Sequence, residues 1–375
     1  MGRKSWSICT RKRTNGSMRL RQKNNTLFTM EEYSMKRNIR FALVGTGIIA
    51  VNHAKAIAAH PEAELVAIAE KDADRGRAFA AEHGIGQVFG DYERMLKQDD
   101  IDVVCVCVPS GLHGDVTIAS AQAGKHVLCE KPLEIRREKM DEMIAACRKY
   151  GVKLGTVFQK RTTQQAAIVG RAIREGKLGK LVLGDVYMKY YRSPEYYRSA
   201  DWRGTWAVDG GGALMNQGVH GIDLLLSLMG DVESVIAYAA PLVHDIEVED
   251  TAVAAVKYKN GAFGVIQGTT SVYPGAEMRA EIHGELGSIV FADSGFKVWK
   301  FAGSDEEAPQ TAGQAEGSSD PRAISGDGHY ILVDDMIGAI REDRDPLIPG
   351  EEGRKAVDLI LAIYESARTR QEVKL

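Results

Sequence analysis

The chain has 375 residues, of which 44% are hydrophobic and 26% are charged, with 39 Gly and only 10 Pro. This composition is that of a globular protein long enough for two domains, and it excludes a chain that is disordered throughout or built from fibrous repeats. No stretch approaches the roughly 18 consecutive apolar residues that a membrane-spanning helix requires, so we expect a soluble protein without a membrane partner.

Charge is distributed unevenly along the chain, although the formal net charge is only −3. Residues 1–40 contain 11 Lys and Arg and two acidic residues, which leaves 37 basic and 49 acidic residues in 41–375. Basic arms bind nucleic acid in some proteins, but this one has no periodicity, so we expect no nucleic-acid partner. We predict a basic, disordered extension over residues 1–36. An upstream translation extension and a transit peptide are the alternatives.

The cysteines indicate the redox environment. Cys9, Cys105, Cys107, Cys129 and Cys147 are odd in number and lack the spacing of metal ligands, so we predict no metal site. Cys105 and Cys107 alternate with valines, which is typical of small apolar residues in a buried strand. We therefore expect a reducing compartment and a cytoplasmic location.

The first part of the sequence after this extension alternates short apolar runs with amphipathic segments. This pattern is typical of βαβ units on a parallel sheet, so we predict a doubly wound, Rossmann dinucleotide-binding domain over residues 37–158. The predicted strands are 39–44, 64–69, 102–108, 126–129 and 153–158, and the predicted helices are 48–59, about 73–83, 113–123 and 137–149.

The pattern changes after residue 158, and we predict a second, α+β domain over 159–375 for substrate binding and oligomerisation. Short alternating runs between 232 and 300, separated by turn signals, predict a large, mostly antiparallel open sheet. The other predicted elements are a helix at about 163–175, a strand at 180–192, a glycine turn and helix over 210–229, a polar loop at 302–328, and helices at about 329–342 and 350–369.

A glycine-rich string, Gly45-Thr46-Gly47-Ile48-Ile49-Ala50, carries the cofactor prediction. It follows a predicted strand and begins a predicted helix, which is the context that a dinucleotide fingerprint requires. Gly45 allows a tight turn, Gly47 lets the backbone approach a pyrophosphate, and Ala50 permits close packing of the helix. Without a dinucleotide, the same string is a glycine turn in an α/β protein.

Glu70 at the end of the second predicted strand bears on the choice of dinucleotide. It follows Gly45 by 25 residues, where a carboxylate accepts hydrogen bonds from both ribose hydroxyls of NAD. The same carboxylate would repel the 2′-phosphate of NADP, and the adjacent Lys71 would offset part of that repulsion. We predict NAD, with NADP as the alternative.

Three further strings carry a resemblance: Val108–His113, Ala123–Pro132 with its Glu130-Lys131-Pro132, and Gly210–Asp223. Together with the glycine fingerprint they resemble the Gfo/Idh/MocA family of NAD(P)-dependent oxidoreductases, the glucose–fructose oxidoreductase and inositol dehydrogenase relatives. The resemblance extends over about residues 37–375. It implies an NAD-dependent dehydrogenase that oxidises a secondary hydroxyl of a sugar, sugar derivative or cyclitol.

The resemblance also implies roles for two residues. Lys131 would point at the reacting hydroxyl, with a cis peptide bond before Pro132, and His220 would act as acid and base. Alcohol oxidation requires these functions, because a proton leaves the hydroxyl and negative charge develops on its oxygen. The alternative readings are a surface lysine at a strand end and a structural histidine.

Two neighbours of His220 in a regular helix are candidates to orient its ring. Asn216 lies four residues before it and Asp223 three residues after it, on the same helix face. The inositol dehydrogenase branch has Asp where this chain has Asn216, and Asn carries no charge. We expect Asn216 to orient the imidazole or to bind a substrate hydroxyl, and Asp223 to orient it instead, to cap the helix or to pair in the core.

Residues 190–206 concentrate six aromatic side chains and three arginines just before the glycine turn. Aromatic faces pack against the C–H faces of a sugar ring, and Arg binds hydroxyl, carboxylate or phosphate oxygens. This favours a polyhydroxylated ring with an anionic substituent. A hydrophobic staple or an oligomer contact is the alternative.

The predicted site residues fall into a cofactor set and a substrate set. His113 belongs to the cofactor set, and a packing role is its equal alternative. We expect the cofactor to contact Gly45, Thr46, Gly47, Ile48, Ile49, Glu70, Pro109, Ser110, His113, Glu130 and Lys131. We expect the substrate to contact Lys131, Gln159, Arg161, Arg203, Trp206, Asn216 and His220.

Two other functions of the same fold are open. One is an NAD-dependent glycosidase that oxidises and re-reduces its substrate, and the other is a non-catalytic nucleotide-dependent sensor. Relatives form dimers or tetramers, and the open face of an antiparallel sheet is a natural symmetric contact, so we expect a homodimer or homotetramer.

Overall fold

The computed structural model describes residues 19–21, 27–29, 37–311 and 327–375. Most of the extension that we predicted to be disordered, and most of the predicted loop over 302–328, lies outside the described residues. Within that extension, β1 (Arg19–Arg21) and β2 (Leu27–Thr29) pair as antiparallel strands, which the sequence did not indicate.

Residues 39–156 contain a parallel sheet with the strand order β5-β4-β3-β6-β7-β8. This order reverses at β3 and β6, as it does in a Rossmann fold, and the predicted doubly wound domain is confirmed. The strands are β3 (Ile39–Val44), β4 (Ala63–Ala69), β5 (Gln87–Phe89), β6 (Val103–Val106), β7 (His126–Cys129) and β8 (Leu154–Thr156). The helices are α2 (Ile48–Ala59), α3 (Ala73–His83), α4 (Tyr92–Leu96), α5 (His113–Gln122) and α6 (Arg137–Tyr150).

The central strands of this sheet are buried on both faces. All four residues of β6 are buried, including Cys105, and five of the six residues of β3 are buried. Continuous apolar strands of this kind are typical of parallel sheets covered by helices on both sides. The described cysteines, Cys105, Cys107, Cys129 and Cys147, are free thiols.

The second sheet has the strand order β15-β14-β13-β9-β12-β11-β10-β16, and only β9 and β12 pair in parallel. The predicted mostly antiparallel sheet is therefore confirmed. Its strands are β9 (Leu181–Lys189), β10 (Val232–Ala240), β11 (Thr251–Tyr258), β12 (Phe263–Thr269), β13 (Arg279–Gly284), β14 (Gly287–Ala292), β15 (Gly295–Phe301) and β16 (Val373–Lys374). The helices of this region are α7 (Gln164–Arg174), α8 (Pro194–Arg198), α9 (Val219–Met229), α10 (Asp327–Glu342) and α11 (Gly350–Thr369).

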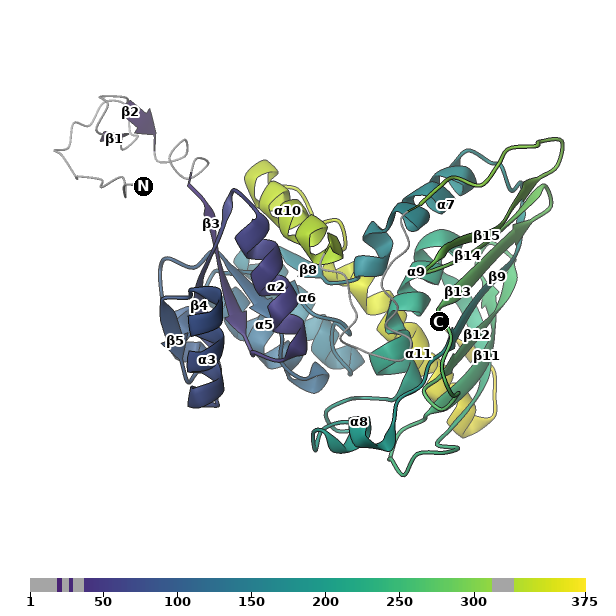
Figure 1. Ribbon diagram of the computed structural model, residues 1–375, viewed down its shortest axis with the longest axis horizontal. Coiled ribbons are helices and arrows are strands. Elements are labelled where there is room, and N and C mark those ends of the chain that lie inside the picture. Colours follow the sequence, from purple (N-terminus) through teal and green to yellow (C-terminus); the bar gives the residue numbers. More distant parts are fainter. Residues whose placement is uncertain (1–18, 22–26, 30–36, 312–326) are drawn as a thin grey trace.

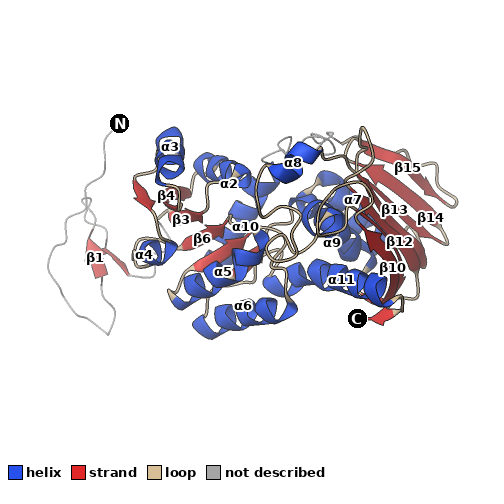
Figure 2. Ribbon diagram, turned by 90° about the horizontal axis from the view of Figure 1, so that it is seen from below, coloured by secondary structure: helices blue, strands red, loops and turns tan. Residues whose placement is uncertain are grey.

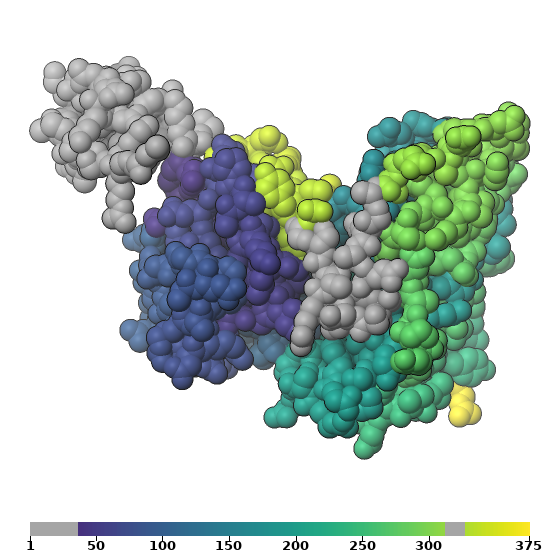
Figure 3. All heavy atoms as spheres, in the orientation of Figure 1, coloured from purple at the N-terminus to yellow at the C-terminus, as the bar shows by residue number. Residues whose placement is uncertain are grey.

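Two helices connect the halves of the molecule (Figures 1 and 2). Helix α11 packs against β10 and also contacts β8 of the nucleotide-binding sheet, and α10 packs on α2. Helix α10 therefore belongs spatially to the nucleotide-binding side, although its sequence falls in the second predicted unit. Figure 3 shows the purple and blue nucleotide-binding part on one side of the molecule and the teal and green sheet part on the other.

None of the helices in the described ranges is both long and apolar enough to cross a membrane.

The buried centre of the parallel sheet generates a stability prediction. Leu43 in β3 is fully buried, so Leu43→Ala removes packed atoms and leaves a cavity. We expect the free energy of unfolding to fall by about 2–5 kcal/mol, measured by chemical denaturation. Val88 on the edge strand β5 is 40% exposed, and Val88→Ala is the control with a loss of about 1 kcal/mol or less. Equal losses in the two variants would contradict this assignment of the core.

Candidate active site

The glycine turn between β3 and α2 has the geometry that a pyrophosphate site requires. Gly45 has φ of 92°, and a Cβ there would lie 2.6 Å from the carbonyl oxygen of Cys107. Gly47 is the N-cap residue of α2, so no side chain covers the first N–H groups of the helix, and no atom lies within 4 Å of the position of a Cβ at this residue. The first N–H groups of α2 are therefore available to an anion.

Glu70 lies beside this turn and is 7% exposed. The backbone amide and hydroxyl of Thr46 both donate to its Oε2, and Arg75 donates to its Oε1 at 2.6 Å. Burial raises the pKa of Glu70, but the hydrogen bonds from Arg75 and Thr46 outweigh that effect and hold the pKa below its ordinary value. The residue is thus a carboxylate at the edge of the glycine turn, as a ribose acceptor must be.

The turn after β6 contains the predicted residues Pro109, Ser110 and His113. Pro109 precedes the short 3₁₀ helix Ser110–Leu112. The two ring nitrogens of His113 each lie 2.8 Å from a backbone carbonyl, those of Pro132 and Val108. Burial lowers the pKa of His113, and a neutral imidazole has a single N–H, so only one of these contacts is a donated hydrogen bond. This environment favours the packing alternative for His113.

Lys131 follows β7 and is joined to Pro132 by a cis peptide bond, as we predicted. Its Nζ donates to the backbone carbonyl of Asn216 at 2.9 Å, across the two parts of the chain. Burial lowers the pKa of Lys131, and the negative charges of Glu130 and Asp209 oppose this effect. The ammonium is therefore held by the opposite half of the molecule.

The helical segment whose Asn216 carbonyl accepts the hydrogen bond from Lys131 begins irregularly. We predicted a glycine turn followed by a helix, but residues Ala213–Gly218 form a π-helix before α9. Gly212 lacks a Cβ where one would overlap the carbonyl oxygen of Glu249. Single-turn π-helices are frequent at functional sites, and here the widened turn contains the carbonyl that accepts the hydrogen bond from Lys131.

Glu249 anchors the start of this π-helix, and it was not among the residues predicted from the sequence. Its carboxylate accepts hydrogen bonds from the amides of Gly212 and Leu214 and from the hydroxyl of Tyr364 in α11. Burial raises the pKa of Glu249 to about 7. Gly211 and Gly212, just before the π-helix, cannot carry a Cβ, because their backbone lies against Tyr364 and Glu249, respectively.

His220 is the second residue of α9, and both of its ring nitrogens are sheltered without a hydrogen-bond partner among the described residues. Its ring packs edge-on against Phe158, with 5.8 Å between ring centroids. Burial, followed by the charge of Lys131, holds the pKa of His220 well below its ordinary value. A buried polar group is normally paired, so this neutral imidazole is suited to a partner supplied by a ligand.

The side chain of Asn216 does not orient His220, so the first of the two expected roles is wrong, and its contact with a substrate hydroxyl stays a prediction. Its Nδ2 donates to Asp209 at 2.6 Å, and its Oδ1 accepts from Gln217. The π-helix moves Asn216 out of the i, i+4 register that a regular helix would give it. Asp209, which is 2% exposed and precedes the glycine run, was not among the predicted residues.

Asp223 does not orient His220 either. It forms a buried, two-pronged ion pair with Arg161, with distances of 2.6 and 2.7 Å. Core pairing, one of the alternatives left open, is therefore the observed role of Asp223. Arg161 is held by this pair, and its predicted contact with substrate stays a prediction.

The aromatic and arginine segment is ordered mainly by stacking. The guanidinium of Arg203 lies 4.3 Å from the ring centroid of Tyr196 and 4.5 Å from that of Trp202. Arg192, which was not singled out from the sequence, is 3% exposed and donates to Gln217. Both arginines are close enough to lower the pKa of Lys131, and Glu130 and Asp209, which act more strongly, oppose them.

The two other predicted substrate residues lie in different environments. Gln159 follows the last strand of the parallel sheet, and its Oε1 is sheltered without a partner in the described part of the chain. Trp206 packs edge-on against Tyr364, with ring centroids 5.2 Å apart, and lines a cavity of about 990 Å³. Neither Lys131 nor His220 is among the residues that line that cavity, and the predicted contact of Trp206 with substrate stays a prediction.

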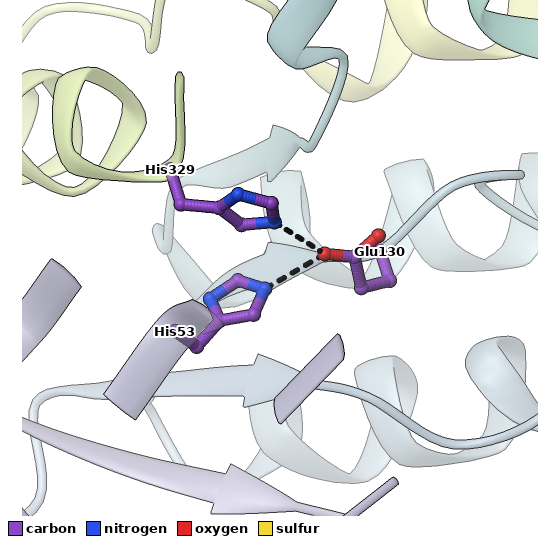
Figure 4. Close-up of side chains that lie close together, drawn as sticks. All are labelled: His53, Glu130 and His329. Carbon is purple, nitrogen blue, oxygen red and sulfur yellow. Dashed lines mark hydrogen bonds and ion pairs between the residues drawn. The ribbon is translucent and has the colours of Figure 1, made fainter. Parts of the chain in front are cut away.

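Glu130 lies in a buried cluster with His53 and His329 (Figure 4). Nε2 of His53 lies 2.8 Å and Nε2 of His329 lies 3.3 Å from the same oxygen, Oε1 of Glu130. Neither histidine was predicted, because they come from α2 and α10 and only the fold brings them together. The predicted contact of Glu130 with the cofactor stays a prediction.

Comparison with known families agrees with this geometry. Residues 39–158 match the description "Oxidoreductase family, NAD-binding Rossmann fold", and residues 167–290 match the Gfo/Idh/MocA C-terminal domain. The first range contains the glycine turn and Lys131, and the second contains His220.

Several known proteins are similar over most of their length. The WlbA dehydrogenase of Bordetella pertussis, solved in complex with NADH and UDP-GlcNAcA, is 39% identical with a TM-score of 0.81, covering 90% of this chain and 99% of that one. A 1,5-anhydro-D-fructose reductase of Ensifer adhaerens is 29% identical, covering 90% and 98%. A myo-inositol 2-dehydrogenase of Thermotoga maritima is 27% identical, also covering 90% and 98%. The chain therefore belongs to the Gfo/Idh/MocA family of NAD-binding oxidoreductases.

Proposed function

We propose that this protein is an NAD-dependent dehydrogenase that oxidises a secondary ring hydroxyl of a UDP-linked uronic acid sugar. The observation that carries the reaction is the unpartnered, neutral imidazole of His220 beside the ammonium of Lys131. The choice of a sugar nucleotide rests on the similarity to the WlbA dehydrogenase that binds UDP-GlcNAcA.

The charges around Lys131 support an anionic substrate. Arg192 and Arg203 both lower the pKa of Lys131, and Lys160 adds to the positive field at His220. A carboxylate or diphosphate placed here would gain charge-assisted hydrogen bonds from the arginines. A neutral cyclitol would make no charge-assisted hydrogen bond with these arginines, so we favour a charged sugar over inositol.

The residues of the glycine turn fit NAD. The α2 N-terminus would hold the pyrophosphate, and Glu70 would hold the ribose hydroxyls. When bound, NAD supplies the acceptor for the hydride that leaves the ring carbon.

The protein side of the reaction uses two groups. A ring nitrogen of His220 accepts the proton of the substrate hydroxyl, which requires the neutral imidazole that burial favours. The ammonium of Lys131 donates a hydrogen bond to the same oxygen and stabilises the negative charge that develops on it.

The first prediction concerns the substrate. With NAD, the protein should produce NADH from UDP-GlcNAcA, measured by absorbance, and turn over UDP-GlcNAc and myo-inositol far more slowly because they lack the carboxylate. His220→Asn and Lys131→Met should each lower kcat by about 10²–10⁴-fold. Full activity of either variant, or faster turnover of myo-inositol, would overturn the proposal. Release of UDP without NADH would instead indicate the glycosidase alternative.

The second prediction concerns the cofactor. Glu70→Ala removes the ribose acceptor and frees Arg75, so we expect KM for NAD to rise by about tenfold or more and discrimination against NADP to weaken. Asp74 is an exposed carboxylate in the first turn of α3, and Asp74→Asn is the control without effect on either cofactor. Unchanged cofactor preference in Glu70→Ala would remove Glu70 from the site.

We also propose that the outer face of the second sheet joins copies of this chain. Apolar side chains are exposed there, including Tyr238 at 79%, Phe263 at 58% and Ile236 at 51%. One face of an antiparallel sheet is normally polar when it contacts water, so an apolar outer face favours a homodimer or homotetramer.

The third prediction tests this assembly. Light scattering should give a mass of two or four chains, and Val253→Lys on β11 should release monomers because it buries a charge in the contact. Val88→Lys in the nucleotide-binding sheet is the matched control, since both valines are 40% exposed. A monomeric wild type would exclude the contact. The expected cytoplasmic location and absence of nucleic-acid binding stay predictions.

A further inference from the structure

Glu130 is a buried carboxylate whose two oxygens face in different directions. Oε1 contacts the Nε2 atoms of His53 and His329, and Oε2 accepts a hydrogen bond from the backbone N–H of Lys131 at 3.2 Å. Glu130 is 4% exposed, and both histidines are fully buried. One carboxylate therefore joins α2, the end of β7 and α10 directly behind the lysine of the site.

The protonation states of this cluster follow from burial and pairing. Burial lowers the pKa of His53, so it is neutral and donates its Nε2–H to Glu130. The hydrogen bonds from His329 and His53 outweigh burial and hold the pKa of Glu130 well below its ordinary value. Nδ1 of His53 has no partner among the described residues, which suits a bare acceptor on a neutral ring better than a second N–H.

The same three side chains are the set among the described residues that could hold a cation. In the observed arrangement, however, both Nε2 atoms point at one oxygen (Figure 4). A zinc ion would need to lie about 2.0–2.2 Å from each ligand atom, and the carboxylate oxygen itself occupies the position where the two nitrogens converge. The geometry is that of a hydrogen-bonded cluster.

The negative charge of Glu130 acts on Lys131. Four charged groups affect the lysine from neighbouring elements: Glu130 and Asp209 raise its pKa, and Arg192 and Arg203 lower it. The neutral ring of His220 lies close enough for the charge of Lys131 to lower its pKa. Without Glu130, the lysine would be buried beside two arginines with Asp209 as its remaining counter-charge in this set.

We propose that Glu130 is a positioning residue for Lys131: the two histidines hold it ionised behind the lysine, and its charge keeps the ammonium protonated toward the substrate. The inference rests on the proposed function for the role of Lys131. The link itself is a property of the free protein and can be measured without substrate.

The test compares the pKa of Lys131 in wild type and Glu130→Gln. Glutamine keeps the shape and one acceptor oxygen but removes the charge. Trace labelling with acetic anhydride, followed across pH by mass spectrometry of the Lys131 peptide, reports the fraction of free amine. We expect the pKa of Lys131 to fall by about one unit or more in the variant. An unchanged pKa would overturn the proposal even if no substrate is ever found.

Glu134 provides the matched control. It is a fully buried carboxylate in the same loop, and it accepts hydrogen bonds from the amides of Ile135 and Arg136. Glu134→Gln should leave the pKa of Lys131 unchanged, and an equal fall in this variant would show that the effect is not specific to Glu130. Zinc bound to the purified wild type and absent from Glu130→Gln would replace the hydrogen-bonded cluster by a metal centre.

A second variant tests positioning separately and serves if Glu130→Gln does not fold. Glu130→Asp keeps the charge but shortens the side chain, so it cannot reach the histidines and the Lys131 amide together. We expect the pKa of Lys131 to stay near the wild-type value, while kcat for UDP-GlcNAcA falls by about tenfold or more with little change in KM for NAD. Wild-type kcat in this variant would contradict the positioning role.

Discussion

The hydrogen bond from the Lys131 ammonium to the Asn216 carbonyl is the contact on which the site depends, because it joins the two sheets of the molecule at the reacting group. Lys131 is fixed from one side by its place after β7, and Asn216 is fixed from the other by the π-helix that Glu249 anchors. The π-helix and the glycine run before it place the carbonyl of Asn216 next to the ammonium of Lys131. His220 follows about one turn later, at the start of α9.

Desolvation sets the charges at this junction. Burial disfavours a charge on His220 and on Lys131; Glu130 opposes this effect at both groups, and Asp209 opposes it at the lysine. The imidazole is consequently neutral and able to accept a proton, and the neighbouring ammonium can stabilise the oxygen that loses it. Desolvation also acts on Glu130. The hydrogen bonds from His329 and His53 outweigh it and hold the pKa of Glu130 well below its ordinary value.

Features that depend on a short stretch of sequence were predicted correctly. Contacts between side chains from distant segments were not. The parallel strands and the turn at Gly45 follow from apolar periodicity and from a short motif in the right context, whereas Lys131 and His220 were identified through the resemblance of their surrounding strings to the family. The π-helix was not predictable from a run that reads as an ordinary helix. Asp209, Glu249, His53 and His329 were missed because their partners lie far along the chain, and Asp223 was assigned partly to His220 because helix spacing does not reveal its pairing with Arg161.

If Lys131 and His220 act on one hydroxyl, a crystal structure of the protein with NAD and UDP-GlcNAcA will show both side chains at that group. We expect Nζ of Lys131 and one ring nitrogen of His220 both to lie within hydrogen-bonding distance, about 2.6–3.2 Å, of the same ring hydroxyl. A closed complex in which the two nitrogens contact different groups, or in which His220 faces away from the sugar, would contradict it.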